Sequence, residues 1–131
     1  MLLGSAAVVP RAFASDQHAC SNASLNGSYG FYRTGINALG PLAALGIAIF
    51  DGNGNMSGSQ SISRGGVISF DSPIAATVQV ATDCTGKGFA PDGSEFFRIV
   101  VVDGGNGFYI FSESVGAAIY GVGRKMNGGD D

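Results

Sequence analysis

Charged side chains embedded in apolar, strand-like segments are the residues of this chain best suited to chemistry. Arg33, Arg98, Glu113 and Arg124 all lie among Phe, Tyr, Ile and Val. A charge that faces the interior must be paired, because burying an isolated charge is very costly. An inward Glu113 beside Arg98 or Arg124 would bind a polar head group or act as acid and base. The alternative is that these charges face solvent or form a structural ion pair, since alternation alone does not identify the inner face.

Aromatic side chains near these charges complete the candidate site. Their rings offer apolar surface and their hydroxyls offer hydrogen bonds, which suits a small apolar or amphipathic ligand. The predicted ligand-binding residues are Tyr29, Phe31, Arg33, Arg98, Tyr109, Phe111, Glu113, Tyr120 and Arg124. The sequence leaves open whether the protein is an enzyme, and no catalytic residue is assigned.

Histidine and cysteine are too few for the common catalytic and metal sites. A Ser-His-Asp triad needs a histidine in the folded domain, whereas His18 precedes the predicted barrel. Two cysteines and one histidine do not form a zinc site without further carboxylate ligands. Residues 51–55 begin like a calcium loop, but Met56 and Ile62 stand where a glycine and a glutamate are needed. A hairpin turn is therefore predicted there, with weak surface calcium binding as the alternative, and no metal or cofactor is assigned.

The N-terminal residues indicate export. An apolar run over residues 2–9 precedes Ala12-Phe13-Ala14, which matches the A-x-A pattern of signal-peptide cleavage. Because no basic residue precedes the run, we expect residues 1–14 to be a signal peptide with a truncated start, and the protein to be secreted or periplasmic. The alternative is an apolar arm that pairs with a neighbouring subunit. In an oxidising compartment the two cysteines predict a disulfide between Cys20 and Cys84.

The composition fits one β-rich domain. The chain has 131 residues with 22 glycines and 45% apolar residues, including nine Phe and four Tyr, which argues against disorder. A formal net charge of −3 and the lack of a basic cluster exclude nucleic acid as an expected partner. We expect a leader at 1–14, a lead with Cys20 at 15–27, a barrel at 28–126 and a flexible tail at 127–131.

Short alternating segments separated by Asp-Gly and Asn-Gly turns predict antiparallel strands. No segment has helical spacing over more than two turns, and no membrane span is expected. In one segment Met56, Gly58, Gln60 and Ile62 share a face opposite a row of serines. Strands are expected at 28–36, 42–50, 56–63, 67–70, 76–82, 86–90, 95–103, 108–115 and 117–125.

The number of strands predicts the architecture. About eight strands joined by short turns favour an all-β fold, an antiparallel up-and-down β-barrel, because a sheet of that size can close on itself. A β-sandwich is the alternative. The order of short hairpins favours the barrel.

Several turn and strand motifs carry a family resemblance. Cys20-Ser21-Asn22-Ala23, Leu25-Asn26-Gly27-Ser28-Tyr29, Phe50-Asp51-Gly52-Asn53-Gly54 and Val102-Asp103-Gly104-Gly105 resemble short exported bacterial barrel proteins. The chain also resembles the small barrels of the calycin and allene oxide cyclase type, including plant dirigent proteins. The resemblance spans most of residues 20–125 and implies a barrel fold, with no catalytic residue carried over.

Three classes of function follow from such a barrel. The leading prediction is a binding protein that holds a small apolar or amphipathic molecule in the lumen or mouth. The second is a cyclase or isomerase, in which the cavity shapes a reactive chain and excludes water. The third is a structural or assembly protein of the cell surface, with a packed lumen. Homo-oligomerisation is left open.

Overall fold

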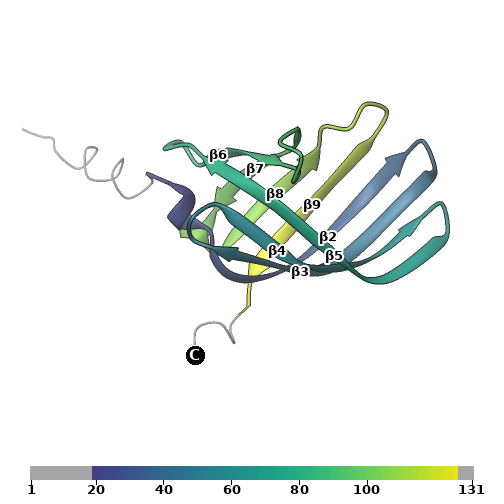
Figure 1. Cartoon of the computed structure of the whole chain (residues 1–131), viewed down its shortest axis with the longest axis horizontal. Helices are drawn as coiled ribbons and strands as arrows, with labels where there is room; N and C mark the ends of the chain where they lie inside the picture. The colour runs from purple at the N-terminus through teal and green to yellow at the C-terminus, as the bar shows by residue number, and fades with distance from the viewer. Residues whose placement is uncertain (1–18, 127–131) are drawn as a thin grey trace, which may run out of the picture.

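The chain folds into a closed antiparallel barrel whose strands follow one another in sequence order (Figure 1). The computed structural model describes residues 19–126, so the predictions for residues 1–14, His18 and the tail lie outside the described residues. The strands are β2 (Asn26–Asn37), β3 (Gly40–Asp51), β4 (Asn55–Arg64), β5 (Val67–Val80), β6 (Thr85–Phe89), β7 (Glu95–Val102), β8 (Gly107–Ser112) and β9 (Ala118–Lys125). The up-and-down barrel is thus confirmed, and the β-sandwich is not formed.

In the described part of the chain, residues 19–126, helical structure is limited to two short 3-10 turns. These are η1 (Asn22–Ser24), which precedes the first strand, and η2 (Asp103–Gly105), which joins β7 to β8. Within residues 19–126, no helix is long and apolar enough to cross a membrane.

Strand β2 closes the barrel, because it pairs with β3 on one edge and with β9 on the other. Its alternation places Tyr29, Phe31 and Arg33 on one face, as the sequence predicts. Tyr29 is fully buried, and Phe31 and Arg33 line an internal cavity, so this is the inner face. The inner row of β4 is confirmed as well, since Ile62 is buried in the core.

The prediction of two strands at 67–70 and 76–82 is wrong, because β5 runs unbroken across Asp71-Ser72-Pro73. The ladder with β4 shifts register between Gln60 and Ile62, and Asp71 adopts a left-handed conformation with φ 52°. Pro73 is tolerated because this part of β5 pairs with β4 alone and needs no second ladder. A bulge therefore absorbs the residues that resemble a turn.

The main core lies at the end of the barrel that carries η1 and η2. Tyr29, Phe50 and Phe108 pack there with ring centroids 5.3 to 5.8 Å apart. Leu25, which follows η1, is 1% exposed and belongs to the same cluster. The segment before β2 therefore covers this end of the barrel and closes it.

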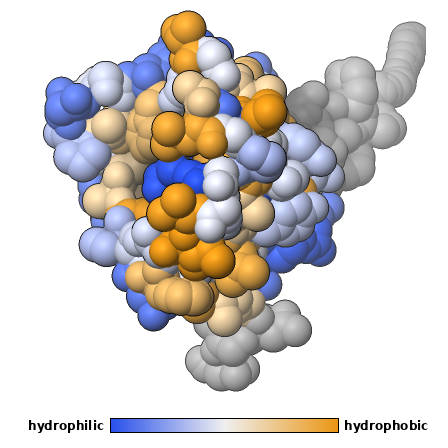
Figure 2. All heavy atoms as spheres, turned by 90° about the vertical axis from the view of Figure 1, so that its right-hand side faces the viewer, coloured by the Kyte–Doolittle hydropathy of each residue, from blue (hydrophilic) through white to orange (hydrophobic). Residues whose placement is uncertain are grey.

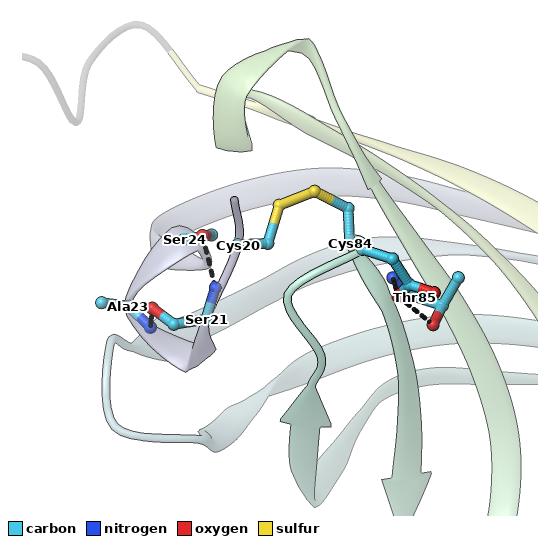
Figure 3. Close-up of a disulfide and its surroundings, with 7 residues drawn as sticks. Cys20, Ser21, Ala23, Ser24, Cys84 and Thr85 are labelled. Atoms are coloured by element: carbon cyan, nitrogen blue, oxygen red, sulfur yellow. Dashed lines mark hydrogen bonds between the residues drawn. A yellow bond between two sulfur atoms is a disulfide. The ribbon is translucent and has the colours of Figure 1, made fainter. Parts of the chain in front are cut away.

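The predicted disulfide is confirmed and ties that segment to the barrel (Figure 3). Cys20 is bonded to Cys84, which lies in the turn between β5 and β6. The backbone N–H of Cys20 donates to the carbonyl of Thr82 at 3.1 Å, and Asn22 Oδ1 accepts from the N–H of Val80 at 2.8 Å. One covalent bond and two hydrogen bonds thus hold the lead against the β5–β6 turn.

Candidate functional site

A cavity of about 600 Å³ occupies the lumen above the aromatic core. Phe50, Phe97 and Phe108 form part of its lining on the side of the core. Further apolar lining comes from Phe31, Ala48, Met56, Ile74, Ile99, Ile110 and Ile119. A volume of this size lies within the range of about 300 to 1,000 Å³ that small-molecule pockets occupy.

The cavity exists because one wall of the barrel is short. Strand β5 has 14 residues but β6 has only 5, so β6 pairs with no more than Thr77–Val80 of β5. The hairpins β2–β3 and β4–β5 extend farther than β6–β7, as the right-hand side of Figure 1 shows. Ile74 of β5 and Pro91 of the β6–β7 turn both line the cavity. The short wall leaves space that the longer strands do not fill.

The open end of the barrel is rich in exposed apolar side chains. Leu39 at the β2–β3 turn is 68% exposed, Phe70 near the start of β5 is 75% exposed, and Val115 between β8 and β9 is fully exposed. Figure 2 views the molecule from this side and shows hydrophobic residues around a smaller hydrophilic centre. This end of the barrel therefore exposes apolar side chains, although none of these three lines the cavity.

Arg33 is the charged residue that lines the cavity. Its Nη2 donates a hydrogen bond at 3.0 Å to Oε1 of Gln60 on β4, the strand on the far side of β3. On the neighbouring strand a Cβ at Gly121 would lie 2.9 Å from the Cγ of Arg33, so the missing side chain gives the arginine stem room. Burial lowers the pKa of Arg33, and the positive charge of Arg64 lowers this pKa further. The residue stays charged at neutral pH, because guanidinium groups are not deprotonated in proteins.

Arg98 and Glu113 lie together on the outside of the barrel. Arg98 Nε is 2.6 Å from Glu95 Oε2 and 3.5 Å from Glu113 Oε2, and Lys87 Nζ is 4.0 Å from Glu95 Oε1. The side chains of this cluster are between 27% and 50% exposed. The predicted strand at 108–115 ends at Ser112, and Glu113, which has the parity of the exposed residues Tyr109 and Phe111, does not line the cavity. This arrangement matches the alternative given by the sequence, in which the charges form a structural ion pair.

Burial and charge move the pKa values of the two carboxyl groups in opposite directions. The pKa of Glu113 is raised, first by desolvation and then by its hydrogen bond with Glu95 and the negative charge there. The pKa of Glu95 is lowered, first by its hydrogen bond with Arg98. Oε1 of Glu113 is buried and lacks a hydrogen-bond partner. Of the two acids, Glu113 therefore keeps its proton to the higher pH.

The other candidate residues divide between the core, the outer wall and the mouth. Tyr29 lies in the core, where its hydroxyl donates to the carbonyl of Gly105 and burial raises its pKa. Tyr109 is 54% exposed, and Arg124 Nη1 lies 2.8 Å from Asp103 Oδ2 at an exposed position. Phe111 and Tyr120 are more than half exposed and also border the cavity. The structure thus brings Phe31, Arg33, Phe111 and Tyr120 to one cavity, and does not bring Tyr29, Arg98, Tyr109, Glu113 and Arg124 there.

Gln60 is the main cavity residue absent from the predicted set. A signal for it exists in the sequence, since it is the one amide in the inner row of β4, which otherwise holds Met56, Gly58 and Ile62. Ile74 and Ile110 were not predicted either. The local sequence around an isoleucine does not show whether it will line a cavity or lie in a packed core. The cavity is created by the short β6 wall, which is distant from these residues in sequence.

The 51–55 segment forms the predicted hairpin turn between β3 and β4. Oδ1 of Asp51 accepts from the backbone N–H of Asn53 at 2.7 Å and of Asn55 at 3.0 Å, and Oδ2 accepts from the Asn55 amide at 2.7 Å. These hydrogen bonds lower the pKa of Asp51. Among residues 19–126, no group of three or more His, Cys, Asp or Glu side chains is placed to hold a metal ion.

Comparison with known proteins yields one structural likeness. No family model and no curated protein matches the chain. The fold is similar to that of a de novo designed fluorescence-activating β-barrel, at 12% identity and a TM-score of 0.45. The match covers 79% of this chain and 94% of the designed chain.

Proposed function

We propose that this barrel binds a small apolar or amphipathic molecule in its lumen. The observation that carries the proposal is the cavity of about 600 Å³ with an apolar lining and the Arg33–Gln60 pair. Protein interiors are packed to the density of organic crystals, and voids larger than a water molecule are few. Apolar walls with a few polar groups that orient a ligand are typical of small-molecule sites.

The cavity also separates this proposal from the other predicted functions. The alternative of a structural or assembly protein predicts a packed lumen, whereas this lumen contains a cavity. A cyclase or isomerase would gain support from Glu113 inside the cavity, yet Glu113 is ion-paired with Arg98 on the outside of the barrel. Membership of the calycin or allene oxide cyclase type remains a prediction, and no observation favours a reaction over binding.

We propose that the protein functions outside the cytoplasm. The Cys20–Cys84 disulfide supports this placement, because disulfides persist in oxidising compartments. The signal peptide predicted at 1–14 remains a prediction. Determining the N-terminal residue of the mature protein from its native source would test it.

The proposal is tested with N-phenyl-1-naphthylamine, a neutral dye whose fluorescence rises in apolar surroundings. Wild-type protein should bind the dye saturably with one site per chain. Ile110→Trp fills part of the lumen and should weaken binding about tenfold, which corresponds to about 1.4 kcal/mol. Ile47→Trp makes the same exchange at a position that is 40% exposed, and it should bind like the wild type.

The location of the dye is checked by NMR on protein with labelled isoleucine methyl groups. Magnetisation transfer from the dye should reach the cavity isoleucines Ile74, Ile99, Ile110 and Ile119. Transfer confined to exposed isoleucines such as Ile47 and Ile49 would refute a lumen site. Absence of saturable binding would refute it as well.

A further inference from the structure

We propose, on the basis of the lumen site above, that the barrel selects amphipathic molecules with a carboxylate head group, which Arg33 and Gln60 bind while the apolar part fills the cavity. The structure offers three independent reasons: the partners of Arg33, the charge distribution around the lumen, and the shape of the polar group relative to the apolar walls.

The first reason is that Arg33 has no counterion among residues 19–126. A guanidinium has five N–H donors, and the hydrogen bond of Arg33 to Gln60 uses only one. In the part of the chain that the structure describes, the ion pairs join Lys87, Arg98 and Arg124 to carboxylates, and none involves Arg33. A partly buried charge without a partner is costly, and an anionic ligand would remove that cost.

The second reason is the sign of the charge near the lumen. Arg64 at the end of β4 is close enough to act electrostatically on Arg33, so a second positive charge reinforces the first. The carboxylates of Glu95, Glu113 and Asp103 are ion-paired with other cations on the outer surface. Arg33 would therefore attract a negatively charged group of a ligand, because these surface carboxylates neutralise other cations and not Arg33.

The third reason is geometric. The guanidinium fork matches the two oxygens of a carboxylate, and the amide nitrogen of Gln60 is a further donor beside it. Arg33 lies on β2 directly opposite Ala44 and Gly121, and the missing side chain at Gly121 leaves room for its stem. Phe31, Ile74 and Ile110 supply apolar wall within the same cavity. A fatty acid or an aromatic acid has this distribution of charge and apolar surface.

The test uses decanoate and decan-1-ol as competitors that share a chain length and differ in charge. Both are titrated against N-phenyl-1-naphthylamine bound to the full chain at pH 8, below the concentration at which decanoate forms micelles. For the wild type we expect decanoate to displace the dye at a concentration at least about tenfold lower than decanol. Arg33→Met keeps an apolar stem and should abolish this preference while dye binding persists. Lys87→Met removes an exterior cation and should keep the preference.

The outcomes separate the two proposals. If the dye binds but decanoate and decanol compete equally in the wild type, the carboxylate preference is refuted and the lumen site stands. A preference that survives in Arg33→Met also refutes the role of Arg33. If the dye fails to bind the folded wild type, the lumen site itself is refuted. Retained dye binding by Arg33→Met shows that this variant is folded, and Gln60→Leu provides a second variant that should reduce the preference.

Discussion

Glu95 and Glu113 share Arg98, and the two acids differ in how each is held. Glu95 accepts the short hydrogen bond from Arg98 Nε, whereas Glu113 is farther from that cation and has one buried, unpartnered oxygen. Their pKa values therefore depart from the ordinary value of 4.5 in opposite directions. Because the two departures lie on opposite sides of that value, the pH dependence of stability distinguishes the two residues.

The wild type should lose stability as pH rises, because Glu113 ionises. We predict that Glu113→Gln does not show this loss. The raised pKa of Glu113 means that its stabilising contribution is complete below the unfolded pKa of about 4.5 and is lost as pH rises through the folded pKa. The glutamine amide can still donate to Glu95. Thermal unfolding between pH 4 and 8 should therefore show the variant gaining stability over the wild type toward neutral pH, with little difference at pH 4.

Glu95→Gln is the matched control for this experiment. The lowered pKa of Glu95 means that its contribution is present above the unfolded pKa and is lost as pH falls through the folded pKa. This variant should be less stable than the wild type at neutral pH and should lose that deficit in acid. Parallel unfolding curves for wild type and Glu113→Gln at all pH values would contradict the assignment.

At the level of the strands, glycines on the inner face make room for large side chains on neighbouring strands. Phe108 of β8 lies over Gly123 of β9, and Phe97 of β7 lies over Gly88 of β6. A Cβ at either glycine would overlap the ring. The pairing of small with large residues fills the core end of the barrel without widening it.

We predict that Gly123→Ala lowers the free energy of unfolding by about 1 to 3 kcal/mol, the usual cost of overpacking. The ring of Phe108 has little freedom to yield, because it packs against Tyr29 and Phe50 with centroids 5.6 and 5.8 Å away. Gly30→Ala is the control, since a Cβ at Gly30 meets nothing within 4 Å. Its effect should stay within about 0.5 kcal/mol in urea denaturation. Equal effects of the two substitutions would contradict this packing.

The sequence predicted which residues share a face of a strand where the alternation was regular, but neither which face is the inner one nor where the strands end. Tyr29, Phe31 and Arg33 alternate with smaller or polar residues, so their common face follows from the two-residue period. An inward Glu113 was one of the expectations, but Glu113 has the parity of Tyr109 and Phe111, which are more than half exposed, whereas Phe108 and Ile110 line the cavity. Strand ends depend on the neighbouring strand, which the local sequence does not contain.

For the whole molecule, the strand number predicted closure, but the cavity depends on the unequal strands β5 and β6. The two ends of the barrel consequently differ. The end with η1 holds the disulfide and the aromatic core, whereas the other end carries long hairpins around the lumen. This division implies that stability and binding can be changed separately.

We predict that the double variant Cys20→Ser and Cys84→Ser loses stability but keeps its ligand affinity. The disulfide spans 64 positions in sequence, and the chain-entropy model assigns such a loop about 4 kcal/mol. Urea denaturation should show this loss, provided that the variant is folded at the start. Its affinity for N-phenyl-1-naphthylamine should stay within about twofold of the wild type, because Arg33, Gln60 and Ile110 are not held by the lead. A folded double variant that no longer binds the dye would contradict this prediction and show that the closed end shapes the lumen. The cavity and the aromatic core would then form a single packed unit.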